Sequence, residues 1–99
     1  MDVVIDELII EKDRPEHIAK HDVEVDEVFE VVFGNFTYIQ GRQDCWLLIG
    51  KTKKDRFLTI VIGERKGENV YGLVTARPSR KEEKSFYQEF ILNQGGEEK

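Results

Sequence analysis

The chain has 99 residues, of which 39% are hydrophobic and 35% are charged. A chain of this size forms one domain, and its composition excludes collagen-like, low-complexity and intrinsically disordered classes. The formal net charge of −5 argues against extended wrapping of DNA, although it leaves room for one local RNA site. A single cysteine, Cys45, excludes an internal disulfide, and the sequence shows neither a leader-like start nor an apolar run long enough to span a bilayer. We therefore expect a cytoplasmic protein with no membrane segment.

The N-terminal third is predicted to form one strand and two short helices. Residues 3–10 are rich in β-branched side chains, which is typical of a strand. Pro15 fits the first turn of a helix that begins at residue 13 or 14 and runs through His21. Apolar residues at i, i+3, i+4 and i+7 predict a second helix that ends at Gly34, with its apolar stripe formed by Val25, Val28, Phe29 and Val32.

The middle of the chain changes to the pattern of β-strands. Short segments rich in aromatic and β-branched residues, separated by turn-forming loops, predict an antiparallel meander of residues 36–39, 45–49, 57–62 and 70–76. The segment 57–62 is apolar on both faces and is expected at the centre of the sheet. We therefore predict an α+β fold, in which the antiparallel sheet has a possible further N-terminal strand, two short helices precede it and a C-terminal helix packs on it.

The C-terminal helix is predicted to open after Pro78. Ser79 and Glu82 have the spacing of a capping box, and the apolar face that would pack on the sheet consists of Phe86, Tyr87, Phe90 and Ile91. The sequence thus predicts a single domain over residues 1–92 and a disordered tail over residues 93–99.

The predicted meander gathers cations at one end of the sheet. A turn at residues 65–68 would place Arg56 directly opposite Arg77 in neighbouring strands. The lysine-rich loop before Arg56 and the start of the last helix, whose free N–H groups favour anions, lie at the same end. The predicted phosphate-binding edge consists of Lys51, Lys53, Lys54, Arg56, Arg77 and Arg80.

Two alternatives to this edge stay open. Arg77 could instead pair with Asp44 or Asp55 in a surface salt bridge, which would contribute roughly 0 to 1 kcal/mol. Glu64 and Arg65 form a second charged pair, but the strand rise places them roughly 20 Å from Arg77. We therefore expect Glu64 and Arg65 to cap the turn or to contact a partner rather than to share a phosphate with Arg77.

Two histidines stand four residues apart on the first predicted helix. His17 and His21 could lie on one helix face, but no third ligand accompanies them, so no metal cofactor is expected. His21 precedes Asp22 at the helix end, and a histidine in that position can serve as a general acid or base.

Several short motifs follow one another over roughly residues 9–90. Each motif alone is too short to be specific, so the weight lies on their joint order. They are Lys20-His21-Asp22-Val23, Val28-Phe29, Thr59-Ile60-Val61-Ile62-Gly63-Glu64-Arg65, Val74-Thr75-Ala76-Arg77-Pro78, and a charged helix with Glu82-Glu83 and Tyr87. This order resembles the BrnT family of small toxins. Asp22 stands where that family usually has glycine, so the helix end must make its left-handed turn with an aspartate.

The resemblance implies a RelE-like fold, RNA cleavage without a metal, and neutralisation by a ribbon-helix-helix antitoxin called BrnA. The leading hypothesis is thus an endoribonuclease toxin in which the ribose 2′-hydroxyl attacks the adjacent phosphate. Its catalytic candidates are His21, Arg56, Glu64, Arg65, Arg77 and Tyr87, and its phosphate-binding candidates are Lys51, Lys53, Lys54 and Arg80.

Other function classes remain open at the level of the sequence. One is a catalytically inactive module of the same fold that only binds a small protein, and another is a regulatory domain that binds a small anionic ligand. Because a core this small is thin, a second chain is expected to cover part of the surface, either the antitoxin or a second copy in a homodimer.

Overall fold

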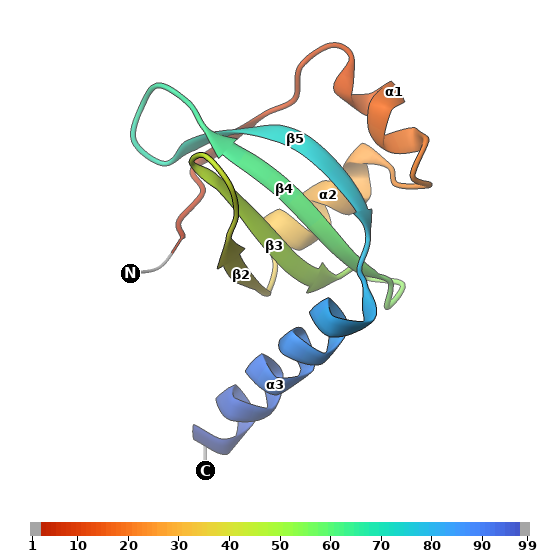
Figure 1. Ribbon diagram of the computed structural model, residues 1–99, viewed down its shortest axis with the longest axis vertical. Coiled ribbons are helices and arrows are strands. Elements are labelled where there is room, and N and C mark those ends of the chain that lie inside the picture. The colour runs from red at the N-terminus through yellow and green to blue at the C-terminus, as the bar shows by residue number, and fades with distance from the viewer. Residues whose placement is uncertain (1–2, 98–99) are drawn as a thin grey trace.

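The computed structural model describes residues 3–97 of the chain. Its elements are β1 (Glu7–Ile9), α1 (Arg14–Ala19), α2 (Val25–Val32), β2 (Phe36–Gln40), β3 (Cys45–Lys51), β4 (Phe57–Glu64), β5 (Val70–Pro78) and α3 (Lys81–Glu97). The strands form one sheet in the order β1-β5-β4-β3-β2, in which β1 runs parallel to β5 and all other neighbours are antiparallel (Figure 1). Within residues 3–97, no helix is long and apolar enough to cross a membrane.

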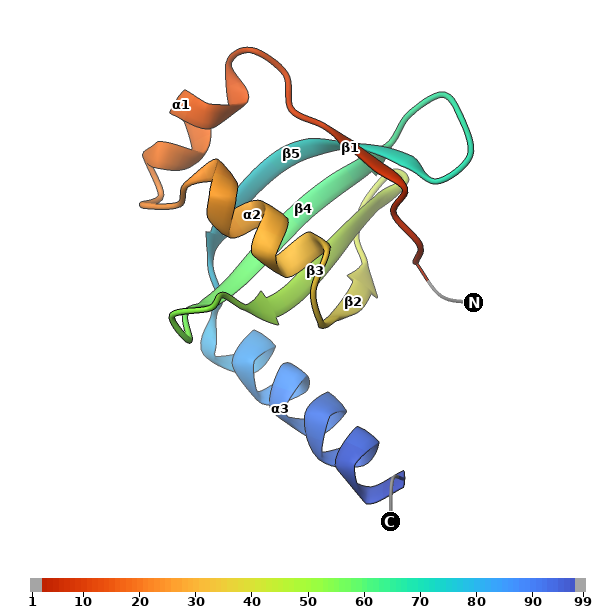
Figure 2. The same cartoon turned by 180° about the vertical axis from the view of Figure 1, so that it is seen from behind.

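One face of the sheet is covered by α2, and we call it the covered face (Figure 2). Opposed residues of antiparallel strands share a face, so Leu48, Ile60 and Ala76 form one row of the core across β3, β4 and β5. The buried core against this face also contains Ile18, Val23, Val28, Val31, Val32, Leu58, Ile62 and Leu73. Each fully buried aliphatic side chain of this kind contributes about 1.5 to 3 kcal/mol to folding.

The two short helices begin and end close to where the sequence predicts. A capping box starts α2, since Glu24 and Glu27 exchange hydrogen bonds between their side chains and backbone N–H groups, with Glu27 Oε1 3.0 Å from the N of Glu24. Between the helices Asp22 has a φ of 63°, so an aspartate does make the left-handed turn. The prediction of two helices before the meander is therefore confirmed.

The strands confirm the predicted meander and correct its N-terminal part. β4 lies between β5 and β3 at the centre of the sheet, as expected for residues 57–62. The strand predicted over residues 3–10 is only Glu7–Ile9, and it pairs with just the first residues of β5. It ends early because α1 occupies the rest of that edge, where the guanidinium of Arg14 donates to the carbonyl of Val74 at 2.6 Å.

The turn between β4 and β5 lies later than predicted. The N–H of Arg65 donates to the carbonyl of Val70 at 3.0 Å, so these two residues close the hairpin. Within the turn, Gly67 (φ 105°) and Asn69 (φ 60°) adopt left-handed backbone conformations that glycine and asparagine tolerate. The predicted turn at residues 65–68 is therefore wrong by one residue on each strand.

A β-bulge shifts the register further along the same pair of strands. Val74 has no partner in β4 and is the extra residue of β5. As a result Arg77 lies opposite Thr59, and the predicted pairing of Arg77 with Arg56 is wrong. Neither turn position nor bulge follows from a hydrophobic pattern, because both strands are apolar on each side of the bulge.

Helix α3 leaves the end of β5 and projects away from the sheet (Figures 1 and 2). Its first turn is capped by Glu83, whose Oε1 accepts the N–H of Arg80 at 2.8 Å, rather than by the predicted pair of Ser79 and Glu82. The helix continues to Glu97, past residue 93 where the sequence predicted a tail. Residues 98–99 of that predicted tail lie outside the described residues.

Only part of the apolar face of α3 packs on the sheet. Tyr87 is 6% exposed, and its ring lies edge-on to Phe57 with centroids 5.8 Å apart. Phe90 lies against Tyr87, whereas Phe86, predicted to pack on the sheet, is 41% exposed. Because the helix projects from the sheet, the residues on its outer side have no strand beneath them.

Candidate functional site

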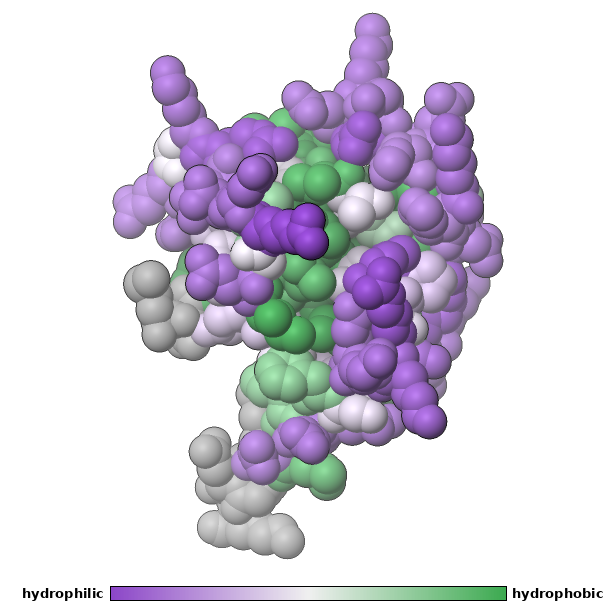
Figure 3. All heavy atoms as spheres, in the orientation of Figure 1, coloured by the Kyte–Doolittle hydropathy of each residue, from purple (hydrophilic) through white to green (hydrophobic). Residues whose placement is uncertain are grey.

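The face opposite α2 is turned toward the viewer in Figure 1, and we call it the open face. It is defined by three opposed pairs of β4 and β5, namely Thr59 and Arg77, Val61 and Thr75, and Gly63 and Gly72. Figure 3 shows an apolar band that crosses this face and continues onto α3, bordered by hydrophilic side chains. Polar groups therefore flank an apolar floor, an arrangement common in binding sites.

At the α3 end of the open face, Arg77 forms a bidentate ion pair with Glu83. Its Nη1 and Nη2 donate to the two carboxylate oxygens at 2.9 and 2.8 Å. Glu83 also accepts from the hydroxyl of the fully buried Thr59 at 2.8 Å, and that hydroxyl lies 2.9 Å from Ser79 Oγ. The network ties the start of α3 to the end of β5 and fixes the direction of the guanidinium.

The charges in this network support each other. The hydrogen bonds from Arg77 lower the pKa of Glu83 to about 2, against the opposing effect of burial, and the N–H of Arg80 and the Thr59 hydroxyl lower it further. Glu83 in turn raises the pKa of Arg77. The pair is therefore fully ionised at neutral pH.

Arg77 nevertheless keeps donors for a ligand. A guanidinium has five N–H bonds, and here two point at Glu83 while a third, on Nη1, lies 3.3 Å from the carbonyl of Pro78. The N–H of Nε and the second N–H of Nη2 have no protein acceptor among the described residues. These two lie on the same side of the guanidinium and form the fork that binds a phosphate or carboxylate side-on.

In the middle of β5, a histidine from α1 reaches the sheet. The Nε2 of His17 and the hydroxyl of Thr75 share a hydrogen bond at 3.0 Å. His17 is partly buried, and its ring lies edge-on to the exposed His21 with centroids 5.7 Å apart. The sequence favours His21 for proton transfer because of its neighbour Asp22, but in the structure it is His17 that contacts the strand. The signal in the sequence is the apolar Ile18 next to His17. Ile18 is fully buried, and His17 beside it is partly buried against the sheet.

At the hairpin end of the open face, Arg65 lies over two opposed glycines. A Cβ at Gly72 would lie 2.6 to 2.7 Å from Nε, Cζ and Nη2 of Arg65, and a Cβ at Gly63 would lie 3.2 Å from its Nη1. Nη1 donates to the carbonyl of Glu64 at 3.0 Å. No carboxylate within the described part of the chain forms an ion pair with this guanidinium. Arg65 is thus a cation on the open face without a neutralising partner.

These three groups follow one another along β5. The five residue steps from Gly72 to Arg77 span roughly 17 Å at the usual strand rise, with Thr75 between them. The order on the open face is therefore an unpaired guanidinium, a histidine and a paired guanidinium. The sequence predicts the separation of Arg65 from Arg77, but it does not show that the two share one face of the sheet.

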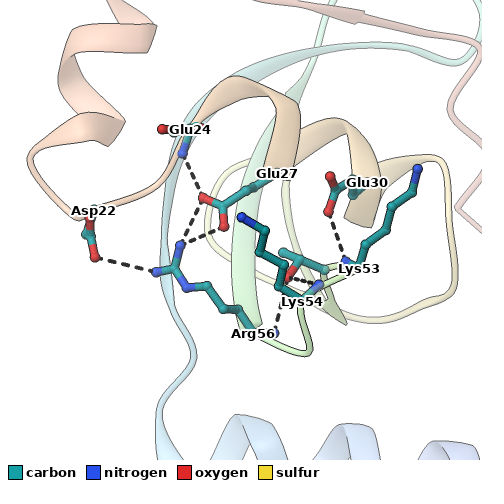
Figure 4. A network of polar contacts seen from close by, with 8 residues as sticks. Asp22, Glu24, Glu27, Glu30, Lys53, Lys54 and Arg56 are labelled. Carbon is teal, nitrogen blue, oxygen red and sulfur yellow. Dashed lines mark hydrogen bonds and ion pairs between the residues drawn. The ribbon is translucent and has the colours of Figure 1, made fainter.

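Arg56 lies on the covered face, on the other side of the sheet from Arg77. Its Nη1 donates to both oxygens of Glu27 at 2.7 and 2.9 Å, and its Nη2 lies 4.0 Å from Asp22 (Figure 4). Burial raises the pKa of Glu27, but the N–H of Glu24 and the guanidinium of Arg56 together lower it below its usual value. The predicted phosphate edge shared by Arg56 and Arg77 is therefore not formed.

The lysine-rich loop joins Arg56 against α2 rather than facing the open side. The N–H of Lys53 donates to Glu30 Oε1 at 2.9 Å, and Thr52 Oγ1 accepts from the N–H groups of Lys54 and Arg56 at 3.2 and 3.1 Å. A pocket of about 480 Å³ between this loop and α2 is lined by Asp22, Glu24, Asp26, Glu27, Glu30, Thr52, Lys53, Lys54 and Arg56. Five carboxylates thus face the cations that were predicted to bind phosphate. The acidic face of α2 was visible in the sequence, but nothing there showed that it turns toward this loop.

The remaining predicted site residues lie apart from the open face or are already engaged. Lys51 Nζ lies 3.4 Å from Asp55 and 5.4 Å from the centre of the Phe57 ring. Glu64 is exposed and pairs with Tyr71, on the covered side of the sheet. Arg77 does form a salt bridge, as the alternative proposed, but its partner is Glu83 and not Asp44 or Asp55. Tyr87 of α3 is buried against Phe57, and Arg80 is exposed.

Among residues 3–97, no three His, Cys, Asp or Glu side chains are grouped so as to hold a metal ion. His17 of α1 and His21, which follows that helix, therefore have no third ligand among the described residues.

The chain is thus a small α+β protein, built on one five-stranded sheet with an open face. No family model matches the sequence, and no curated protein matches it. Among solved structures, the ribonuclease toxin BrnT of Brucella abortus is similar, with a TM-score of 0.62 and 17% sequence identity over 76% of this chain and 97% of that one. At this identity the likeness shows a shared fold, which is the fold that the sequence motifs implied.

Proposed function

We propose that this protein is an endoribonuclease toxin that cleaves RNA on the open face of its sheet. The observation that carries the proposal is the row of Arg65, His17 and Arg77 along β4 and β5 of a fold shared with a ribonuclease toxin. Cations that bind phosphate and a group that moves a proton are what RNA cleavage by the ribose 2′-hydroxyl requires.

In this proposal Arg77 binds the phosphate under attack. Its free fork of Nε and Nη2 takes two phosphate oxygens while Glu83 holds the adjacent edge, formed by Nη1 and Nη2. As the 2′-oxygen bonds to phosphorus, negative charge grows on those oxygens and the ion pair strengthens. Removal of one such stabilising donor costs about 10²- to 10³-fold in rate.

His17 and His21 are the proposed proton-transfer groups. His17, held by Thr75 between the two arginines, accepts the proton of the 2′-hydroxyl, and His21 beside it is the second candidate. The protonated His17, or His21 beside it, then gives a proton to the departing 5′-oxygen as its bond to phosphorus breaks, which leaves a 2′,3′-cyclic phosphate and a 5′-hydroxyl. No metal takes part in these steps.

The test is cleavage of a fluorescent single-stranded RNA by the purified protein in the presence of EDTA. We expect cyclic-phosphate products from the wild type, and a loss of at least about 100-fold in Arg77→Lys, which keeps the charge but loses the fork. Arg56→Lys is the matched control, because it makes the same change on the covered face. Equal loss in the two variants, or products that form only with added metal, would refute the proposal.

The proposed partner is a BrnA-like ribbon-helix-helix antitoxin. Exposed apolar side chains on α3 favour a protein partner, with Phe86 at 41%, Ile91 at 37% and Leu92 at 72% exposure. The same observation favours the alternative of an inactive protein-binding module. Growth arrest on expression, relieved by a co-expressed neighbouring antitoxin gene and by Arg77→Lys, supports the toxin; binding without arrest supports the module.

A further inference from the structure

We infer that Gly63 and Gly72 form a seat that positions the guanidinium of Arg65 for a phosphate group on the open face. The inference rests on the proposed function for the identity of the phosphate, an RNA phosphodiester, but the seat itself is a feature of this chain. The two glycines are positioning residues, and Arg65 makes the contact.

The geometry of the seat allows no side chain at Gly72. A Cβ there would lie 2.6 Å from Nε, 2.7 Å from Cζ and 2.7 Å from Nη2 of Arg65, well inside van der Waals contact. The guanidinium therefore rests directly on the backbone of β5, and Nη1 extends over Gly63 of β4. Both glycines are buried although they belong to the open face, because the guanidinium covers them.

Backbone conformation does not explain these glycines. Gly67 in the adjacent turn has a φ of 105°, but neither Gly63 nor Gly72 has a positive φ. A glycine inside a strand costs roughly 0.5 to 1 kcal/mol relative to alanine, and here two such residues oppose each other in adjoining strands. Close approach of another group is the remaining reason for glycine at such positions.

The seat suits an anion because it leaves the cation both fixed and unneutralised. The bond from Nη1 to the carbonyl of Glu64 holds one end of the guanidinium, and no carboxylate of the described residues pairs with it. The floor beside it is weakly polar, since Cys45 Sγ and a methyl of Val74 each lie 3.6 Å from the Cβ position of Gly63. Arg65 is itself exposed, so a phosphate can reach its guanidinium from solvent.

Pre-orientation also reduces the entropic cost of binding. Immobilising a long side chain on binding costs about 0.5 to 1.5 kcal/mol, and the seat removes this cost before the ligand arrives. Loss of the seat should therefore weaken phosphate binding by about 2- to 13-fold even while Arg65 itself is present.

The test compares Gly72→Ala with Gly63→Ala. The nearest atoms to a Cβ at Gly72 are the far end of a flexible side chain, so the variant should fold and simply displace the guanidinium. At Gly63 the nearest contact is 3.2 Å, so alanine there should disturb Arg65 much less and serves as the matched control. Thermal melts of both variants measure whether the fold is kept.

Binding of inorganic phosphate and of a short uncleavable 2′-deoxy oligonucleotide is then followed by NMR at the Nε–H resonance of Arg65. We expect this resonance to shift when the wild type is titrated with phosphate. In Gly72→Ala the resonance should lie closer to that of a solvent-exposed arginine, and phosphate binding should weaken by about 2- to 13-fold. Adding Gly72→Ala to an Arg65→Ala background should cause no further weakening.

Three results would overturn the seat. They are no response of the wild-type Arg65 resonance to phosphate, wild-type affinity in Gly72→Ala, or further weakening by Gly72→Ala in the absence of Arg65. Failure of RNA cleavage with a responsive Arg65 and a weakened Gly72→Ala variant would instead refute only the proposed function and leave the seat supported.

Discussion

The ion pair between Glu83 and Arg77 predicts that the fold loses stability in acid. The pKa of Glu83 is about 2 in the folded protein, against 4.5 for an unperturbed glutamate. Its folded pKa lies below its unfolded pKa, so its stabilising contribution is complete above about pH 4.5 and is lost as the pH falls through about 2. Such a difference corresponds to at most about 3 kcal/mol, which partial solvent screening of the pair reduces to roughly 2 kcal/mol.

The perturbation is Glu83→Gln, which keeps the shape of the side chain and removes its charge. At pH 7 urea unfolding should show a loss of roughly 2 kcal/mol, equivalent to roughly 10 °C in Tm for a domain of this length. At pH 2 the wild-type carboxyl is about half protonated, so the gap between the two proteins should shrink to less than about 1 kcal/mol.

Glu82→Gln is the matched control, because Glu82 precedes Glu83 in the same helical turn but is exposed and forms no hydrogen bond or ion pair with the described residues. Its stability should follow that of the wild type at every pH. A gap between wild type and Glu83→Gln that is the same at pH 7 and pH 2 would show that Glu83 acts through shape alone, and the electrostatic reasoning would be wrong.

Three further predictions follow from the positions of single side chains. Arg56→Met should lower the free energy of urea unfolding by about 1 kcal/mol, because it removes the hydrogen bonds to Glu27, and should leave RNA cleavage unchanged. A loss of cleavage in a variant that is still folded would contradict the position of Arg56 on the covered face. Asp22→Gly should raise the Tm, by an amount equivalent to about 0.5 to 1 kcal/mol, because φ is 63° there; an unchanged Tm would argue against a strained turn. Tyr87→Ala should cost about 3 kcal/mol in urea unfolding, whereas Phe86→Ala should cost less than about 0.5, and similar costs would show that α3 packs differently.

The elements of the fold were predictable because their signals are local. The apolar spacing of Val25, Val28 and Val32 identified α2, and the uninterrupted apolar character of residues 57–62 identified the central strand. Both depend on a few neighbouring residues whose burial dominates the energy of the segment. The extent of β1 was not predictable in this way, since its length is set by where α1 takes over the edge of β5.

The partners of charged residues were harder to predict, because an ion pair joins segments whose relative placement the sequence does not encode locally. Arg56 and Glu27 are 29 positions apart, and Arg77 could have paired with several acidic residues at comparable energy. The identity of the partner decides the function considered for each arginine. Arg56 has its charge satisfied on the covered face, whereas Arg77 keeps a free fork on the open face.

A single extra residue in β5 determines whether the candidate site exists. Beyond the hairpin, Gly72 pairs with Gly63, and strict alternation from there would bring Arg77 opposite Leu58 on the covered face. Val74 interrupts the alternation, so that Arg77 lies opposite Thr59 and shares the open face with Arg65. The guanidinium of Arg14 donates a hydrogen bond to the carbonyl of Val74 at 2.6 Å. This bond satisfies a backbone acceptor at the bulge. A hydrophobic pattern cannot reveal this feature, because valine suits either face, and the contact that accompanies the bulge comes from Arg14, 60 positions away in the chain.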